Sequence, residues 1–137
     1  MFEKNISRGI IQPVHELRGH KRAEFIKRML MMSSDIVPAA NCHVSIHEIS
    51  GVPKDAPPYA GIHAHKCDEV YLVLGCKETG KKLRYKFVLG DEHYEVESPA
   101  AVFVPKRLPH KAEALGGHGT LVAILMSGNR QSTLIFE

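Results

Sequence analysis

Two histidines and a glutamate that could bind a metal ion stand close together within residues 61–69. His63 and His65 are two positions apart, so on a β-strand their imidazoles project from the same face, as two ligands of one ion require. A fully extended chain would place Glu69 about 13 Å beyond His65, whereas ligands of one ion lie only about 3 Å apart. The chain must therefore turn at residues 66–68, so that Glu69 starts the next strand and reaches back to the same ion.

A fourth candidate ligand, His110, follows much later in the chain. Residues 105–110 read Pro-Lys-Arg-Leu-Pro-His and come after an apolar run at 102–104. The two prolines predict a tight corner, after which His110 enters a new strand. Three imidazoles and one carboxylate leave one or two open positions on an octahedral ion, and this set suits Fe(II), Mn(II), Ni(II) and Zn(II) alike. The alternatives are core histidines that bind no metal and, for His110, a ring hydrogen-bonded within its turn.

Tyr71 is the candidate catalytic residue, because it has the same strand parity as Glu69 and should point inward beside the ion. Its hydroxyl could orient a substrate or transfer a proton, and ordinary core packing is the alternative. His43 and His47 also share one face of a predicted strand. An inward face would make both line a pocket. The outward orientation is favoured, because the apolar residues between them would then fill the core.

The elements that position these residues are predicted to be short β-strands. Apolar runs are separated by turns rich in Gly, Pro and Asp at intervals of about 8–12 residues, which predicts an all-β sandwich or barrel. Residues 21–33 fit a helix or a strand equally well. We therefore predict an N-terminal arm or edge segment of uncertain structure over residues 1–35 and one β-domain over residues 36–137. The predicted strands cover residues 42–49, 70–74, 83–89, 93–97, 101–104 and 121–126, with an edge strand at 132–136.

The composition is that of one small globular domain. The 137 residues suit a single core, and the formal charge of +3 comes from dispersed basic residues that acidic residues balance. We therefore expect no nucleic-acid partner. The three cysteines form no CxxC pair, and no apolar run is long enough for a signal peptide or a membrane span. These features predict a cytoplasmic protein with reduced thiols and no membrane partner.

The arrangement of these residues resembles the two sequence motifs of the cupin superfamily. His63, His65 and Glu69 form the pattern HxHxxxE, which is followed by Gly75, and the second motif ends at His110. The resemblance covers roughly residues 44–126 and extends to small, stand-alone single-domain cupins, many of them uncharacterised. It implies an all-β fold, the cupin-type double-stranded β-helix or jelly-roll barrel. It also implies that the three histidines and the glutamate are ligands of one divalent transition metal.

Three features depart from the cupin motifs, and one of them is Pro57, which stands where the first motif usually has its first glycine. Five residues separate Glu69 from Gly75, where cupins usually have six, and Arg107 stands where the second motif normally has glycine. Glycine permits a left-handed backbone there, which costs a bulky side chain about 1 kcal/mol or more. One expectation is therefore that Arg107 adopts a different turn. Its guanidinium could pair with an anionic substrate or lie in solvent.

These observations predict a metalloenzyme that acts on a small carboxylate, enol or sugar-like molecule by Lewis-acid or O2 chemistry. Related cupins include dioxygenases, isomerases, decarboxylases and lyases, so the resemblance does not select the reaction. One alternative is a non-catalytic module that binds a sugar or carboxylate with the metal as anchor. Another is a domain that has the motif without the metal. Because cupins commonly pair through their edges, we also expect a homodimer.

Overall fold

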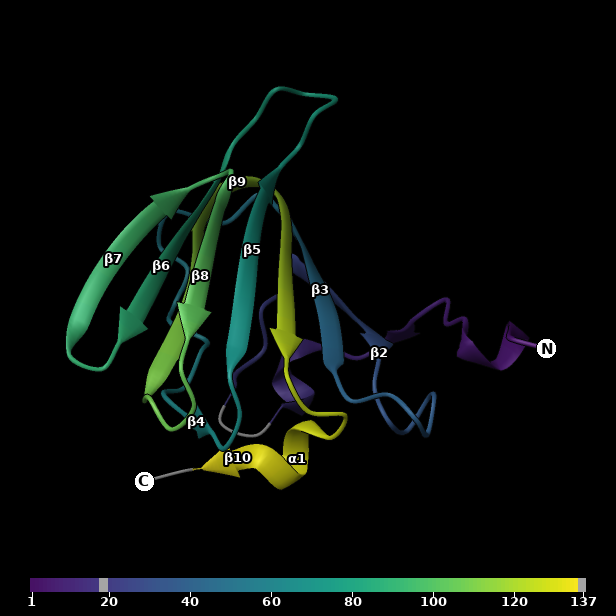
Figure 1. Ribbon diagram of the computed structural model, residues 1–137. Helices are drawn as coiled ribbons and strands as arrows, with labels where there is room; N and C mark the ends of the chain where they lie inside the picture. Colours follow the sequence, from purple (N-terminus) through teal and green to yellow (C-terminus); the bar gives the residue numbers. More distant parts are fainter. Residues whose placement is uncertain (18–19, 136–137) are drawn as a thin grey trace.

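The computed structural model describes residues 1–17 and 20–135, and most of its regular structure is β-strand (Figure 1). The main sheet is antiparallel with the strand order β1-β2-β3-β9-β5-β8, and β9 also pairs with β6, which pairs with β7. The predicted all-β class is confirmed. The strands are β1 (Ile10–Ile11), β2 (Ile26–Met32), β3 (His43–Ser50), β5 (Glu69–Gly75), β6 (Leu83–Leu89), β7 (Glu92–Glu97), β8 (Ala100–Val104) and β9 (His110–Leu125).

Short elements complete the structure, among them the helix that follows β9. They are β4 (Ala64–His65), which pairs with β10 (Leu134–Ile135), the 3-10 helices η1 (Glu3–Asn5) and η2 (Val14–Glu16), and α1 (Arg130–Thr133). The side chain of Asn129 caps α1 by accepting a hydrogen bond from the Ser132 backbone N–H at 3.1 Å. A helical turn therefore occupies the start of the edge strand predicted at 132–136, and residues 136–137 lie outside the described residues. No helix within residues 1–17 and 20–135 is long and apolar enough to cross a membrane.

The long strand β9 connects strands β3 and β5 of the main sheet to the β6–β7 pair. Its residues 110–117 pair with β6, whereas residues 118–125 pair with β3 and lie beside β5 on their other edge. The change of partner falls at glycines: Gly117 has a φ of 87°, and a Cβ there would lie 1.8 Å from the carbonyl oxygen of Lys82. The sequence predicts that His110 enters a strand and that residues 121–126 form one, but not that the two are continuous, because glycine weakens the strand pattern between them.

The segment whose sequence fits either a helix or a strand forms strand β2. It pairs with β3, so hydrogen bonds to the neighbouring strand stabilise the extended form. Ile26 and Arg28 point inward on either side of the exposed Lys27, with 8% and 2% of their surface exposed. Arg28 lies opposite His47 in the β2–β3 register. β2 therefore adds a buried arginine to the interior.

The apolar core is formed by inward residues of β5, β6 and β9. Val73, Tyr85, Phe87 and Leu121 are all buried in one cluster, and burial of each such side chain contributes about 1.5–3 kcal/mol. Elsewhere the interior is polar. The buried polar residues of this second region are Arg28, His43, Ser45, His63, His65, Glu69, His110 and Arg130.

Candidate metal centre

Three of the four predicted ligands converge. His63, His65 and His110 are buried, and one ring nitrogen from each lies within 4.8 Å of the other two. His65 is in β4, and His110 begins β9. His63 forms an isolated antiparallel bridge with His110, in which each backbone N–H donates to the other residue's carbonyl oxygen, at 3.0 and 2.8 Å. This bridge holds the His63 and His110 rings with their centroids 4.6 Å apart.

Glu69 reaches the same place because the chain turns at residues 66–68, as predicted. The turn is held by the Lys66 backbone N–H, which donates to the Thr133 carbonyl at 2.7 Å, and by the Asp68 carboxylate, which accepts from the Lys106 backbone N–H at 2.9 Å. Glu69 then begins β5 with its side chain inward and 4% of its surface exposed. One of its carboxylate oxygens lies 2.9 Å from Nε2 of His110. The structure therefore brings all four residues together.

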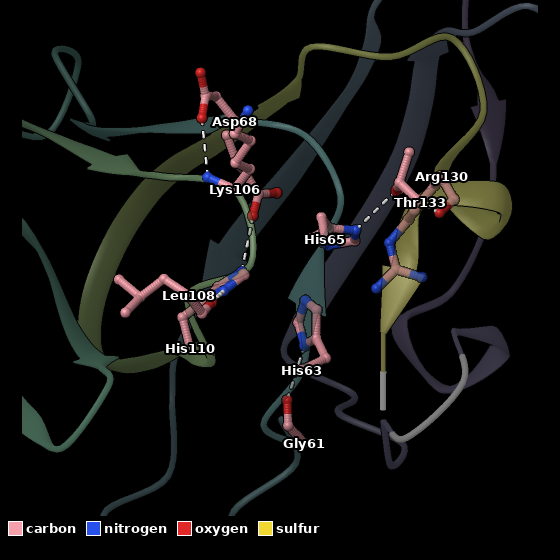
Figure 2. A network of polar contacts seen from close by, with 10 residues as sticks. Gly61, His63, His65, Asp68, Lys106, Leu108, His110, Arg130 and Thr133 are labelled. Atoms are coloured by element: carbon pink, nitrogen blue, oxygen red, sulfur yellow. Dashed lines mark hydrogen bonds and ion pairs between the residues drawn. The ribbon is translucent and has the colours of Figure 1, made fainter. Parts of the chain in front are cut away.

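Hydrogen bonds fix which nitrogen of each ring carries the proton (Figure 2). Nδ1 of His63 donates to the carbonyl oxygen of Gly61 at 3.0 Å, and Nδ1 of His110 donates to that of Leu108 at 2.8 Å. A carbonyl oxygen only accepts, so each Nδ1 is protonated, and the neutral ring has its lone pair on Nε2. Both rings therefore present Nε2 as a ligand atom.

His65 reaches the same state through a side chain. The Thr133 hydroxyl donates to the carbonyl oxygen of Arg130 at 2.8 Å, so it accepts from Nδ1 of His65, which lies 3.0 Å away. The lone pair of His65 is again on Nε2, and this buried atom has no hydrogen-bond partner among the described residues. An acceptor bonded to the far nitrogen is the usual support for a metal-binding histidine.

The donor set fits a cation. Nε2 of His110, when its ring is neutral, and the ionised carboxylate of Glu69 are both acceptors, yet they lie 2.9 Å apart. A proton or a positive ion is therefore needed between them. A divalent ion would satisfy this pair and the unpartnered Nε2 of His65 together. His63, His65, His110 and Glu69 are the residues that would hold it.

Burial keeps two of these rings neutral. Burial lowers the pKa of His63 to about 3, with a contribution from the neighbouring His110. Burial and then the neighbouring His63, which opposes a second positive charge beside it, lower the pKa of His65 to about 2. Because metal binding requires a deprotonated nitrogen, these two ligands need no proton loss at neutral pH.

The centre opens into a cavity of about 40 Å³ that other polar residues line. His43 and His47 are among them, so the outward orientation favoured by the sequence is wrong. Only 7% of the His43 surface is exposed, whereas Val44 and Ile46, on the other face of β3, are half-buried. The expectation assumed an apolar interior, but this part of the interior is a polar cavity. Burial and then the charge of Arg28 lower the pKa of His43 to about 4.

Tyr71 points inward from β5, as the strand parity predicts. Its ring lies 5.2 Å from that of Phe87 and 6.2 Å from that of His110, measured between centroids. It therefore packs against the core and also lines the cavity. Burial, followed by the charge of Glu69, raises the pKa of Tyr71 well above its usual range. The phenol is protonated at neutral pH and can act as a hydrogen-bond donor.

Arg107 adopts the left-handed conformation in which the cupin motif normally has glycine. Its φ is 70°, and its backbone N–H donates to the carbonyl oxygen of His65 at 2.7 Å. The different turn expected for a bulky residue is therefore not formed. The hydrogen bond to β4 stabilises a conformation that costs about 1–2 kcal/mol.

Arg28, Arg130 and Thr133 also belong to this region, although the sequence pattern does not point to them. Arg28 could have been found from its parity in β2, had the segment been predicted as a strand. Arg130 and Thr133 belong to a four-residue helix and reach the centre from the end of the chain. No local pattern marks them.

No protein-family model matches the chain, and no curated protein matches its sequence. Solved structures do match. An RmlC-like cupin from Shewanella frigidimarina NCIMB 400 aligns with a TM-score of 0.56 and 15% identity, over 91% of this chain and 88% of that chain. KdgF from Halomonas sp. aligns with a TM-score of 0.55 and 16% identity, over 90% and 97%. The polyketide cyclase RemF from Streptomyces resistomycificus aligns with a TM-score of 0.58 and 16% identity, over 98% and 84%. The chain therefore has the cupin fold, the all-β jelly roll that its two motifs predict.

Proposed function

We propose that the chain is a metal-dependent enzyme that acts on a small oxygen-bearing molecule, with one divalent ion held by His63, His65, Glu69 and His110. The main support is that one ring nitrogen from each of the three histidines lies within 4.8 Å of the other two, while each ring donates through Nδ1 to an acceptor. An ion held there would supply Lewis-acid polarisation of a substrate oxygen. Fe(II), Mn(II), Ni(II) and Zn(II) are all compatible with this donor set.

Residues of the cavity would supply the proton chemistry. The Tyr71 hydroxyl keeps its proton because burial raises its pKa, so it can donate a hydrogen bond to a substrate oxygen. His43 is neutral at pH 7, because burial lowers its pKa to about 4, and its ring can accept a proton. Buried Leu121 and Leu125 line the same cavity and exclude water. Solved structures of similar fold include a polyketide cyclase and an oxalate decarboxylase, so enzymes of different reaction classes share this architecture.

Elemental analysis of protein purified without an affinity tag tests the metal. We expect about one equivalent of a single transition metal in the wild type and less than a tenth of that in His65→Ala. His93→Ala is the matched control, because His93 is exposed on β7, and it should retain the wild-type content. Less than a tenth of an equivalent in the wild type, even after reconstitution, would refute the proposal. Anomalous scattering at the centre would identify the element and its ligands.

Turnover separates an enzyme from a binding module. Steady product formation from a keto acid or an enol, lost in His65→Ala, supports the enzyme. Saturable binding without product favours the alternative, a module that captures a small molecule with the metal as anchor.

We also propose a homodimer that forms through the β1 edge of the main sheet. β1 is the last strand on that side, and both of its isoleucines, Ile10 and Ile11, are exposed. An edge strand with exposed apolar residues is suited to pairing with another chain. Light scattering should give the mass of two chains, and a monomeric mass would refute the proposal.

A further inference from the structure

Two arginines from distant parts of the chain lie in the cavity beside the candidate metal centre. Arg28, on β2, and Arg130, the first residue of α1, both line it, and only 2% and 8% of their surfaces are exposed. Figure 2 shows the guanidinium of Arg130 beside the rings of His63 and His65. A buried cation is costly unless ion pairs and hydrogen bonds compensate it. The burial of two such cations in one cavity is therefore expected only where some group compensates their charge.

Neither guanidinium is fully compensated within the protein. Arg28 donates through Nη1 to the side-chain oxygen of Gln12 at 2.5 Å, whereas its Nε has no hydrogen-bond partner among the described residues. Within the same residues, Nη1 of Arg130 also lacks a partner. The ion pairs found in residues 1–17 and 20–135 involve neither arginine. Donors that serve only the fold are normally paired when buried.

The cavity carries an excess of positive charge. Burial, followed by the charge of Arg130, lowers the pKa of Arg28 to about 10, so Arg28 remains protonated at neutral pH. Glu69 is the one carboxylate among the described residues that line the cavity, and it is already a candidate metal ligand. An anion near the two guanidiniums would relieve their mutual repulsion and satisfy the unpaired donors.

We propose that Arg28 and Arg130 bind the anionic group of a small ligand, a carboxylate or a phosphate, in this cavity. Guanidinium suits both groups, because its planar fork can donate to two oxygens at once. This inference rests on the proposed function, because it specifies the class of substrate that the proposed enzyme would bind. That substrate would be an anion and not a neutral sugar. The cavity volume of about 40 Å³ favours a small molecule.

Titration calorimetry with malonate, inorganic phosphate and malonamide tests the proposal. The full chain is used as purified and again after removal of metal with a chelator, which excludes direct binding of the anion to an ion. We expect malonate or phosphate to bind at least tenfold more tightly than the neutral malonamide in both states. The tighter of the two anions identifies the group as carboxylate or phosphate. Equal affinity for malonate and malonamide, or no binding of either anion, overturns the proposal.

Variants locate the site. Arg28→Gln and Arg130→Gln should each weaken binding of the preferred anion at least tenfold. Arg84→Gln is the matched control, because Arg84 is exposed on β6, and its affinity should stay within twofold of the wild type. Unchanged affinity in both buried-arginine variants would overturn the proposal. Circular dichroism checks folding, and the wild-type comparison of malonate with malonamide remains decisive for any variant that unfolds.

Metal content measured on the same samples separates this inference from the proposed function. Anion binding by a protein that takes up no metal would support the arginine site and refute the metal. A bound metal in a protein without any preference for anions would support the metal site and refute the arginine site.

Discussion

Thr133 is predicted to control metal affinity without touching the metal. The other two imidazoles donate to backbone carbonyls, which no substitution removes, whereas His65 donates to the Thr133 side chain at 3.0 Å. Thr133→Val keeps the shape and removes the acceptor. Nδ1–H of His65 is then buried without a partner, because only 2% of that residue is exposed. The ring no longer prefers the tautomer that presents Nε2 to the ion.

The expected size of this effect follows from the role of the hydrogen bond. Loss of a group that orients a metal ligand typically lowers affinity 10–100-fold, which corresponds to about 1.4–2.7 kcal/mol. The metal-free protein should also lose about 1–3 kcal/mol of unfolding free energy, because a buried N–H is left unsatisfied. Competition with a fluorescent chelator measures the affinity, and urea unfolding measures the stability.

Two further variants make the result interpretable. Thr133→Ser restores the hydroxyl and should recover most of the affinity. Ser132→Ala removes an exposed hydroxyl from the same helical turn, where it donates to the carbonyl of Asn129, and should bind metal as the wild type does. If folded Thr133→Val binds the ion within twofold of the wild type, the argument that this hydrogen bond sets the tautomer is wrong.

Two other predictions concern pH and backbone strain. His43 has a folded pKa of about 4, so below its ordinary value near 6.5 the unfolded chain takes up a proton that the folded chain does not. The unfolding free energy of the metal-free protein should therefore fall on acidification from pH 6.5 to 4. His43→Asn should reduce the slope of unfolding free energy against pH by about 1.4 kcal/mol per pH unit. Equal slopes for the two proteins in urea unfolding would contradict the lowered pKa of His43. Arg107→Gly should leave stability unchanged or raise it by up to about 1 kcal/mol, because relief of the positive φ outweighs the added freedom of the unfolded chain. Arg107→Val should lower stability, and a glycine variant less stable than the wild type would contradict the strain argument.

The sequence predicts the parts of the centre that depend on local spacing. His63 and His65 share a face because strand side chains alternate, and a turn is the one way for Glu69 to reach them. The corner before His110 follows from two prolines and the apolar run before them. Such features involve neighbouring residues, so their geometry can be derived before the fold is known. That His110 meets the other three candidate ligands is implied only by the resemblance to the cupin motifs. The inward direction of Tyr71 follows from the same alternation.

The rest depends on contacts between distant segments. Thr133 meets His65 across 68 positions of the sequence, and Arg130 reaches the cavity from the same short helix. Neither belongs to a periodic pattern, because a single helical turn is too short to show one. The sequence leaves strand β2 undecided between helix and strand for a related reason. Its extended form is stabilised by β3, and this pairing cannot be seen in the sequence of β2 itself.

The wrong orientation of His43 and His47 is informative about the cavity itself. An interior that served only stability would place the apolar face of β3 inward, since well-packed apolar residues are often at least as stable as buried charges. Here β3 turns its histidines and Ser45 inward, towards the buried Arg28 of β2. Polar side chains are expected in the interior where a protein binds a ligand, and such sites lower the free energy of unfolding of the protein. The polar face of β3 therefore lies in the same polar cavity as the candidate metal ligand Glu69 and the two arginines, and we expect any ligand of this cavity to be polar enough to satisfy them.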